Sequence, residues 1–564
     1  MKTVVLDIEG NSLNHVILDN KGRPVPACTK VHCIATKELN GEAQLWTDIP
    51  AAVRYLSTFD VLVGHNILSY DFPVLRRLHG LMQPKCIVDT VVVSRLMYPD
   101  INNHPFGGNS LEEWGQYLGF PKMDYQGGWA EYNDEMGIYC KNDVVLGERI
   151  YLTQLPFIKD HRSLVRFEHE ITTILMEQQD NGFGYDLHKG EQLLQELVLD
   201  KLGIEDEMRV IFPTKVHERY SEKTGKRLKD KVEVFNPGSR SQIAERLGEK
   251  YGWVPPETDK GNPKVDESVL SKLQYPEAKT LVKYFDTVKL IGMVEDWNLR
   301  AAASSDGRIH GSVNAQGAAT GRCTHSQPNV AQVSGDHRAR ELWVPGYDGW
   351  VQVGADLKGL ELRMLAHYMH RYDGGKYADV LLHGDIHTHN MEAAGIDSRN
   401  LAKSFIYAYL YGAGNAKIAK VLNCSVREAE KLRERFQKEI PALAKVQQEV
   451  QYQVAKYKSV ELPDGRRVPV RSEHAALNTL LQGAGAIVSK MWMLVAHQEL
   501  QQAQLRVQQM AYIHDELQYA ALQCDAEGVG EIVKNAARLA GERLNMKIPI
   551  DADYVIGSSW ADTH

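Results

Sequence analysis

The chain has 564 residues, of which 43% are hydrophobic and 24% charged, and its formal net charge is −8. This length exceeds what a single hydrophobic core supports, so we expect two to four domains with the composition of an ordinary soluble protein. The negative charge argues against nonspecific coating of polyanions, although it leaves room for a local basic cleft.

The cysteines and the N-terminus bear on the cellular compartment. The seven cysteines are odd in number and include no Cys-x-x-Cys pair, which argues for reduced thiols in a cytosol and against a zinc site. Asp7 and Glu9 lie where a signal peptide needs an apolar core, and no apolar run approaches the length of a membrane span. We therefore expect a cytoplasmic protein that is not exported and binds no membrane.

The first 150 or so residues predict an α/β domain that carries four carboxylates. KTVVLDIEG predicts a strand on which Asp7 and Glu9, two residues apart, point to the same face. DVLVGHNILSYDFPVL carries Asp71 just before an expected helix, and MGIYCKNDVVLGERI predicts a helix with Tyr139 and Asp143 on one face. Together the carboxylates would suit two Mg²⁺ ions that activate a water for phosphodiester hydrolysis, with Tyr139 orienting the water.

Residues from about 151 to 310 predict a mainly helical region. RSLVRFEHEITTILMEQQDNGFGYD has helical apolar spacing and should end at Asn181-Gly182. From Lys215 to Lys231 seven basic residues stand against three acidic ones, a local balance of +4, with an expected turn at Thr224-Gly225. This stretch fits either a grip on a nucleic-acid backbone or an ordinary solvated hairpin.

The last region, from about 310 to 564, predicts a second acidic site. WVQVGADLKGLELRMLAHYM reads as a strand that meets a helix at Asp356, and MAYIHDELQYAAL reads as two short strands around His514-Asp515-Glu516. A strand pair can hold Asp515 against Asp356, where two Mg²⁺ ions would clamp a triphosphate and an attacking 3′-hydroxyl for in-line displacement.

Between those two stretches, SRNLAKSFIYAYLYGAG has neither Gly nor Pro before Gly412 and predicts a helix. Arg399, Lys403, Tyr407 and Tyr411 recur at every fourth position and therefore share a face. Two cations near a helix N-terminus followed by two aromatics match a nucleoside triphosphate. The alternative is an amphipathic helix with tyrosines in the core and cations in solvent.

Two sets of motifs resemble known families. Asp7-x-Glu9, then Asp71 in HNxxxYD, then Tyr139-xxx-Asp143 resemble the three motifs of DEDD exonucleases, in the tyrosine-containing proofreading subclass that cuts single-stranded 3′ ends. These motifs all fall within the first 150 residues.

The later stretches resemble motifs A, B and C of family A DNA polymerases, the DNA polymerase I family. They are Asp356 in DxxxxELR, the helix from Arg399 to Gly412, and His514-Asp515-Glu516. GAATGRCTHSQPNVAQV, HGDIHTHN and VRSEHAALNTLLQGAGA also resemble the replicative polymerases of short-tailed coliphages, and the resemblance covers nearly the whole chain.

The resemblance implies an α/β multidomain fold in which an RNase H-like exonuclease domain precedes a right-hand polymerase. The implied boundaries are 1–155 for the exonuclease domain, 156–310 for a mainly helical thumb, 311–383 with 506–564 for a palm built on an antiparallel sheet, and 384–505 for the fingers and adjoining helices.

The resemblance also implies roles for individual residues. The implied metal ligands are Asp7, Glu9, Asp71 and Asp143 in the nuclease site, and Asp356, Asp515 and the backbone carbonyl of Leu357 in the polymerase site. The implied catalytic residues are Asp356, Asp515, Glu516, Lys403 as the acid for the leaving pyrophosphate, and Tyr139. The implied contacts to the incoming dNTP are Arg399, Lys403, His387, Tyr407, Tyr411 and Glu361, the last excluding a ribose 2′-hydroxyl together with Tyr411. The implied contacts to DNA are Arg322, Asn478, Gln482 and His514. Tyr407, in place of Phe, implies easy incorporation of dideoxynucleotides.

The implied function is template-directed DNA synthesis from a primed template with dNTPs, by a two-metal mechanism, with 3′→5′ proofreading, as in a phage replicative polymerase. Each site would hold two Mg²⁺ ions, with Mn²⁺ as a substitute. We expect a monomer that works with a helicase-primase and a single-strand binding protein. Alternatives are a single-subunit RNA polymerase, against which Glu361 and the nuclease motifs argue, and a nuclease or DNA-binding protein with an inactive polymerase domain.

The chain departs from the family pattern at two places. Lys358 occupies a position that is usually small, often Ser, and it adds a cation beside the expected metals. Only the short stretch from Lys215 to Lys231 stands where the coliphage polymerases carry a long insertion that docks thioredoxin. We therefore expect no thioredoxin binding and low intrinsic processivity.

Overall fold

The computed structural model describes residues 1–19, 22–258 and 260–564. These residues form two compact units. The first unit comprises Met1–Gly184, Arg308–Gln332 and Val344–His564, and the second comprises Tyr185–Gly307 with Val333–Trp343. Both acidic clusters expected from the sequence lie in the first unit.

The N-terminal part of the first unit is built on a five-stranded sheet in the order β5-β4-β1-β6-β7. Its strands are β1 (Thr3–Gly10), β4 (Val31–Glu38), β5 (Ala43–Trp46), β6 (Val61–Gly64) and β7 (Cys86–Asp89). β1 runs antiparallel to β4 and parallel to β6, so the sheet is mixed. The helices are α1 (Ile49–Leu56), α2 (Asp71–His79), α3 (Thr90–Met97), α4 (Leu111–Tyr117) and α5 (Asp134–Asp160), and β2 (Ile17–Leu18) with β3 (Pro24–Val25) forms a small hairpin.

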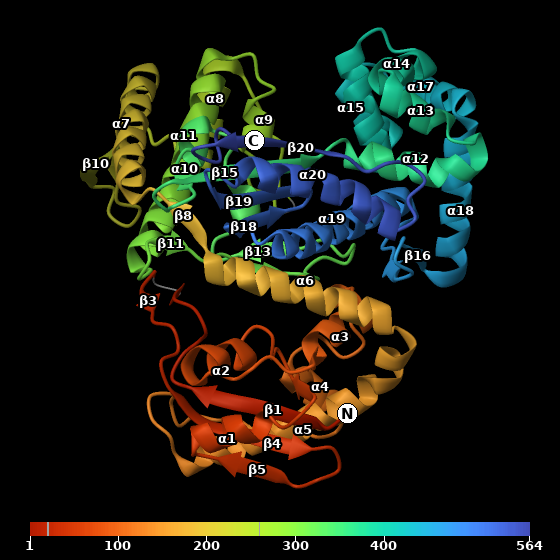
Figure 1. Cartoon of the computed structure of the whole chain (residues 1–564). Helices are drawn as coiled ribbons and strands as arrows, with labels where there is room; N and C mark the ends of the chain where they lie inside the picture. The colour runs from red at the N-terminus through yellow and green to blue at the C-terminus, as the bar shows by residue number, and fades with distance from the viewer. Residues whose placement is uncertain (20–21, 259) are drawn as a thin grey trace. The chain divides into compact units, whose positions relative to one another are not determined.

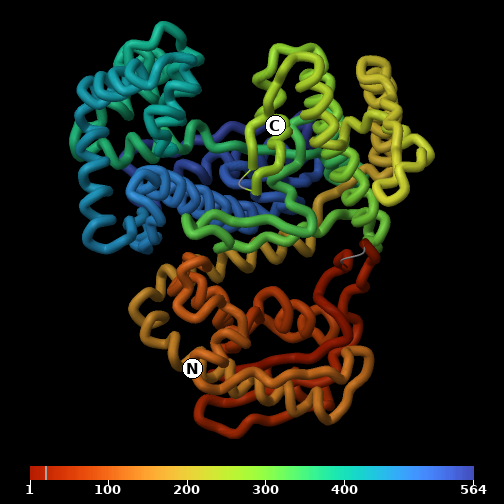
Figure 2. The backbone as a smooth tube through the Cα atoms, turned by 180° about the vertical axis from the view of Figure 1, so that it is seen from behind, coloured from red at the N-terminus to blue at the C-terminus, as the bar shows by residue number. Residues whose placement is uncertain are grey.

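Alternation along β1 places its two acidic residues on one side of this sheet. Val4, Leu6 and Ile8 pack into a core with α1 and α2. Val5 packs on the opposite face, in a core that includes residues of α5. Figure 2 shows α5, in orange, lying along the red strands. Asp7 and Glu9 lie two and four residues after Val5, so all three side chains share one face of β1, as the sequence predicted for the two acidic residues. This face is the one that packs against α5.

Helix α6 (Arg162–Asn181) follows α5 and ends before Gly182, as expected from the Asn-Gly pair. Gly182 has φ +63°, in the region that favours glycine, and its amide caps the helix by donating to the Gln178 carbonyl. One face of α6, including Phe167 and Ile171, is buried in the largest core of the first unit.

The C-terminal part of the first unit is built on a four-stranded antiparallel sheet in the order β18-β19-β15-β20. Its strands are β15 (Trp350–Leu357), β18 (Val507–Ile513), β19 (Glu516–Leu522) and β20 (Ala552–Gly557), and helices α12 (Leu360–Asp373), α19 (Ala476–Ala503) and α20 (Ala526–Arg543) accompany it. The strand ending at Asp356 and Leu357 and the strand pair around Asp515 match the predicted elements.

Helix α19 corrects the expectation that no apolar run approaches a membrane span. The segment Glu473–Ala503 is long and apolar enough to cross a membrane by length and composition. Its most apolar 18-residue window is 83% buried inside the protein, which is the behaviour of a core helix.

A helical group lies between β15 and β18 in the sequence (Figure 1, teal to blue). It comprises α13 (Lys376–His383), α14 (Ile386–Ala394), α15 (Arg399–Leu410), α16 (Asn415–Leu422), α17 (Val426–Glu439) and α18 (Pro441–Tyr457). Further short strands are β8 (Phe183–Tyr185), β11 (Arg308–Ile309), β12 (Ser312–Asn314), β13 (Thr324–Ser326), β14 (Trp343–Val344), β16 (Ser459–Glu461) and β17 (Arg467–Pro469).

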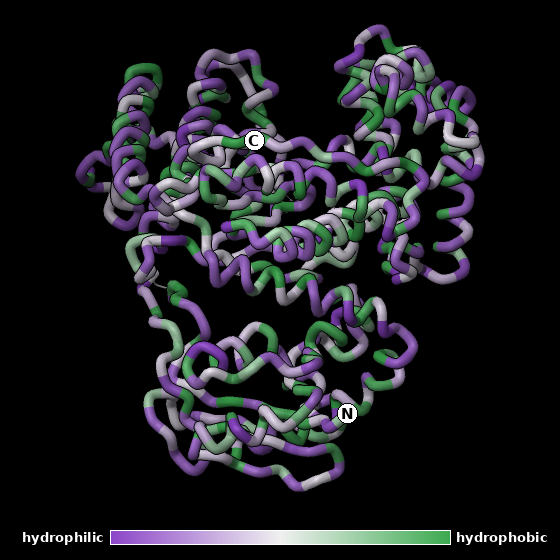
Figure 3. Tube along the Cα trace, in the orientation of Figure 1, coloured by the Kyte–Doolittle hydropathy of each residue, from purple (hydrophilic) through white to green (hydrophobic). Residues whose placement is uncertain are grey.

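The second unit is mainly helical, with α7 (Leu187–Ile211) and α10 (Pro276–Ala303) packed together. It also contains α8 (Arg240–Tyr251), α9 (Glu267–Leu270) and α11 (His337–Arg340). The basic stretch forms a hairpin of β9 (Lys215–Tyr220) and β10 (Arg227–Glu233), with the expected turn at Gly225, whose φ is +63°. The hairpin is largely exposed and hydrophilic (Figure 3), so both interpretations of it stay open.

The expected domain boundaries stay predictions. The compact second unit lies largely within the range expected for a thumb, 156–310, but α6 belongs to the first unit. The α/β architecture is present as expected, and so is a four-stranded antiparallel sheet around Asp356 and Asp515.

Candidate functional site

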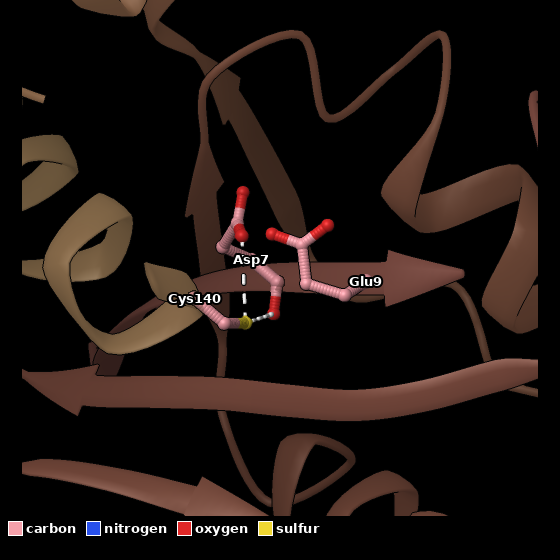
Figure 4. A group of neighbouring side chains, drawn as sticks. All are labelled: Asp7, Glu9 and Cys140. Atoms are coloured by element: carbon pink, nitrogen blue, oxygen red, sulfur yellow. Dashed lines mark hydrogen bonds between the residues drawn. The ribbon is translucent and has the colours of Figure 1, made fainter. Parts of the chain in front are cut away.

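The first acidic cluster is built on β1 and α5. Figure 4 shows Asp7 and Glu9 projecting from one face of β1 toward the space beside Cys140 of α5. The Cys140 thiol lies 3.5 Å from both the backbone oxygen and the Oδ2 atom of Asp7. One ligand atom from each of the three residues falls within 4.8 Å of the others, a spacing that could hold a metal ion. The sequence analysis did not assign Cys140 to this site, because its position next to Tyr139 is the only sign in the sequence that it lies near the carboxylates.

Asp71 and Asp143 complete the cluster from α2 and α5. The Asp71 carboxylate accepts a hydrogen bond of 3.0 Å from the backbone N–H of Ile8, the residue between Asp7 and Glu9. Asp71 and Asp143 are 3% and 4% exposed, so both charges are withdrawn from water. The structure therefore brings together all four carboxylates that the sequence proposed.

The electrostatics of this cluster favour a bound cation. Burial, followed by the neighbouring carboxylates, raises the pKa of Glu9 to about 9 and that of Asp7 well above its usual value. Burial also raises the pKa of Asp71 to about 7, although backbone N–H donors oppose this, and it raises the pKa of Asp143. Such mutually repelling oxygens bind either protons or a hard divalent cation, so the residues present fit Mg²⁺.

Tyr139 lies beside the four carboxylates. Its ring packs against Tyr125 and Trp129, with centroids 5.6 and 6.0 Å away. Burial raises the pKa of Tyr139 to about 12, so the hydroxyl keeps its proton and can donate near neutral pH. Lys122, which sequence reasoning missed, reaches the same site, and its Nζ atom lies 2.8 Å from Asp143 Oδ2. Lys122 lies outside the helices and strands, so no helical or strand periodicity relates it to the carboxylates in the sequence.

The second acidic cluster lies where β15 ends. Asp356 pairs in register with Glu516 on β19 and with Asp553 on β20. The backbone N–H of Leu357 donates to the Asp515 carbonyl at 3.0 Å, which fixes the β18–β19 turn against β15. Burial, then the charges of Asp515 and Glu516, raise the pKa of Asp356 to about 7, and burial raises the pKa of Asp515.

Glu516 is held in place by several partners. Its Oε1 atom accepts hydrogen bonds from Trp560 Nε1 at 2.6 Å and Gln518 Nε2 at 2.7 Å. Its Oε2 atom lies 3.0 Å from His564 Nδ1. Glu516 is 6% exposed, so this carboxylate is fixed beside Asp356.

Lys358, the unexpected cation, points to the β20 side of the cluster. Its Nζ atom lies 2.9 Å from Asp551 Oδ2 and 2.7 Å from Asp553 Oδ1. These contacts raise its pKa, so it stays charged. Lys358 thus offsets the charges of Asp553 on β20, the register partner of Asp356, and of Asp551 just before this strand, a contact that the sequence could not reveal.

Helix α15 presents the expected cations. Ser398 caps its N-terminus, and Arg399 makes a two-pronged contact with Asp385, with N–O distances of 2.7 and 3.1 Å. Burial, then the charges of Arg399 and Lys403, lower the pKa of His387. His387, Arg399 and Lys403 therefore form one basic group, as the sequence-based roles require.

The tyrosines of α15 divide between surface and core. Tyr407 and Tyr411 have ring centroids 6.3 Å apart, and the Tyr411 hydroxyl donates to Glu361 Oε1 at 2.5 Å. Tyr411 is 42% exposed, whereas Tyr409 is 4% exposed and belongs to the core. The alternative prediction, in which Tyr407 and Tyr411 both fill the core, is therefore wrong for Tyr411. Tyr407 is partly buried and packs against the core.

The expected DNA contacts lie at three places. The Arg322 guanidinium lies 3.9 Å from Glu361 Oε1, and its charge acts on Asp515. His514 occupies the β18–β19 turn with φ +58°. Asn478 and Gln482 are one turn apart on α19, and the buried Oδ1 atom of Asn478 has no hydrogen-bond partner among the described residues.

Comparison with known proteins identifies the family to which this chain belongs. Residues 212–562 match the family model "DNA polymerase family A". The DNA-directed DNA polymerases of Enterobacteria phage T3 and Escherichia phage T7 are 32% and 30% identical to this chain, over the whole of this chain and of each relative. These matches place the chain among DNA polymerases. It belongs to DNA polymerase family A.

A solved structure shares the fold. The "POL domain of Pol1 from M. smegmatis complex with DNA primer-template and dNTP" has a TM-score of 0.79 to this chain at 19% sequence identity. The superposition covers 99% of this chain and 95% of that chain. The alignments with the phage relatives span 717 and 720 positions for a chain of 564 residues, so the relatives carry segments that this chain lacks.

Proposed function

We propose that this protein extends a DNA primer on a template with dNTPs, and that its N-terminal site removes nucleotides from 3′ ends. The polymerase proposal rests mainly on one observation: Asp356, at the end of β15, lies beside Asp515 in the β18–β19 turn. The cationic and aromatic face of α15, from Arg399 to Tyr411, belongs to the same unit. Family membership supports this assignment, and the phage relatives support a replicative role.

In the polymerase site, Asp356, Asp515 and the Leu357 carbonyl would hold two Mg²⁺ ions. All of these ligand atoms are oxygens, which hard divalent cations prefer, and a bound cation would relieve the repulsion between the carboxylates. When bound, the ions would supply charge that activates the primer 3′-hydroxyl and stabilises the leaving pyrophosphate. Glu516, fixed by Trp560 and Gln518, would keep Asp356 in position.

The basic group on α14 and α15 would receive the triphosphate. Arg399 would exchange its contact with Asp385 for phosphate oxygens, because both offer paired acceptors to a guanidinium. Lys403 would donate a proton to the leaving pyrophosphate, and His387 would donate a hydrogen bond to it. These three side chains would orient the incoming dNTP through its triphosphate.

Tyr407 and Tyr411 would cover the nascent base pair at the ring end of the same ligand. A hydrogen bond joins Tyr411 to Glu361, and these two side chains would lie against the ribose and leave no room for a 2′-hydroxyl. This arrangement supports selection of deoxynucleotides over ribonucleotides, and so disfavours the RNA polymerase alternative. Arg322, Asn478, Gln482 and His514 would contact the primer-template.

In the N-terminal site, Asp7, Glu9, Asp71 and Asp143 would hold two Mg²⁺ ions in the same way. When bound, the ions would supply positive charge that increases the acidity of an attacking water and stabilises the leaving oxygen. Tyr139, protonated and packed against aromatic rings, would orient the attacking water. The burial of all four carboxylates around one strand face supports this proposal.

Complementary variants test the two activities in one protein. Asp515→Asn should abolish primer extension with dNTPs and Mg²⁺ and leave degradation of single strands intact. The double change of Asp7→Ala and Glu9→Ala should do the reverse. Primer extension by the first variant would refute the metal assignment, and equal use of ribonucleotides by the wild type would favour the RNA polymerase alternative.

The short hairpin of β9 and β10 bears on processivity. The hairpin is short where the resemblance implies a long insertion that docks thioredoxin. We therefore infer low intrinsic processivity without thioredoxin, in a monomer that relies on a helicase-primase and a single-strand binding protein. Product lengths on a primed single-stranded template, with and without thioredoxin, test this. A large increase with thioredoxin would contradict the inference.

A further inference from the structure

Lys122 is the cation of the N-terminal acidic cluster. Its Nζ atom lies 2.8 Å from Asp143 Oδ2 and 4.8 Å from the ring centroid of Tyr139. Among the ion pairs of the described residues, this is the one that involves any of the four clustered carboxylates. A lysine ammonium is charged at neutral pH, and this one is paired with the buried Asp143 carboxylate.

The backbone around Lys122 is fixed by neighbouring elements. The amide of Met123 donates to Asn142 Oδ1 at 3.4 Å, which ties the segment to α5 beside Asp143. On the other side, the amide of Phe120 donates to the Gly115 carbonyl at 2.9 Å. A Cβ atom at Gly115 would lie 2.8 Å from the Phe120 carbonyl oxygen and 3.0 Å from the backbone nitrogen of Lys122, so glycine permits this close approach of the two backbones. The backbone that carries the Lys122 side chain is thus held in place on both sides of the residue.

The position of the ammonium also leaves it accessible. The Lys122 side chain is 26% exposed, whereas that of Asp143 is 3% exposed. An ammonium has three donors, and Asp143 uses one of them. The Tyr139 hydroxyl engages a second donor, and the third can serve a phosphate that enters the acidic cluster.

Hydrolysis of a 3′-terminal phosphodiester creates a need for such a donor. Water attacks phosphorus and loses a proton to solvent, the bond from phosphorus to the 3′-oxygen breaks, and that oxygen takes a proton from solvent. Negative charge grows on the phosphoryl oxygens during this step, and a preorganised cation in a half-buried site stabilises it.

We propose that Lys122 is a catalytic residue of 3′-end hydrolysis, whose ammonium donates to the scissile phosphate while it keeps Tyr139 and Asp143 aligned. This proposal rests on the nuclease function proposed above for the same site. Lys122 would thus supply a positive charge at this site, in addition to the carboxylates and the tyrosine of the sequence motifs.

Three variants test the proposal: Lys122→Gln, Lys122→Arg and the control Lys85→Gln. Lys85 lies in the same domain, is 75% exposed and pairs with Asp60 at 2.6 Å. The measurements are the single-turnover degradation rate of a saturating single-stranded oligonucleotide in Mg²⁺, its Kd by fluorescence anisotropy in Ca²⁺, and primer extension. Lys122→Gln should lower the degradation rate about 100-fold, the typical loss for one transition-state donor. Lys122→Arg should stay within about tenfold of wild type, because it keeps the charge.

The outcomes separate the possible failures. Kd and primer extension should change less than about threefold in every variant, since transition-state stabilisation leaves ground-state binding nearly unchanged. A Lys122→Gln rate within threefold of wild type overturns the proposal, as does a Kd increase that accounts for the whole loss. Equal losses in Lys122→Arg and Lys122→Gln also overturn it. A wild type without Mg²⁺-dependent degradation overturns the nuclease function itself.

Discussion

A buried ion cluster joins α6 to α19 in the first unit. Lys490 Nζ lies 2.9 and 3.0 Å from the two carboxylate oxygens of Glu168, and Arg466 Nη2 lies 2.6 Å from Glu168 Oε1. Arg466 also pairs with Asp464 at 2.7 Å. The side chains of Lys490 and Glu168 are 0% exposed and that of Arg466 is 8% exposed. Two cations and two anions balance one another away from water.

Lys490→Met removes one cation and leaves the cluster with a net negative charge. Breaking a buried ion pair costs about 3–5 kcal/mol, and Arg466 still faces Glu168, so we expect a loss of about 3 kcal/mol in unfolding free energy. The double variant Glu168→Met with Lys490→Met leaves only the neutral Arg466 and Asp464 pair. It should recover at least half of that loss, because no unpaired buried charge remains.

Urea denaturation followed by tryptophan fluorescence measures these changes, and buried Trp492 reports from the same helix as Lys490. The pKa of Glu168 is lowered, because Lys490 and Arg466 outweigh the effect of its burial. The stabilisation is therefore present above the usual glutamate pKa of about 4.5 and is lost as the pH falls further. A loss below about 1 kcal/mol for Lys490→Met, or a double variant as unstable as the sum of the two single variants, would refute the reasoning.

Three further predictions follow from the two sites. Without metal, Asp71 has a folded pKa of about 7 against an ordinary 3.8, so the folded state binds the proton more tightly and loses stability as pH rises from about 4 to 7. Asp71→Asn should raise the unfolding free energy by about 4 kcal/mol at pH 8 in EDTA and change it little at pH 4, as thermal and urea melts would record; an equal gain at both pH values contradicts this. Glu361→Ala should weaken discrimination against ribonucleotides by roughly 10- to 100-fold in kcat/KM, because Tyr411 loses its partner; unchanged discrimination argues against this pair as the selector. Tyr407→Phe should reduce incorporation of dideoxynucleotides relative to dNTPs in chain-termination assays, and an unchanged ratio contradicts the role given to its hydroxyl.

The sequence by itself determined the parts of each site that lie on one element. Asp7 and Glu9 share a strand face because side chains alternate along β1, and Tyr139 and Asp143 share a helix face because they are one turn apart. The stripe from Arg399 to Tyr411 follows the same rule. The meeting of Asp356 with Asp515 was also predicted, because a strand pair can hold the two side by side and the polymerase motifs imply it, and the pairing of β15 with β19 brings it about.

Only the tertiary structure decided which groups from distant segments complete these sites. Lys122 enters the nuclease cluster through an irregular segment held by Asn142 and Gly115, and no periodicity encodes that path. Lys358 turns to Asp551 and Asp553 because β20 pairs beside β15, a contact between residues nearly 200 positions apart. Local spacing fixes the direction of a side chain on its own element. The partner it meets depends on how separate elements pack, and therefore on the whole core.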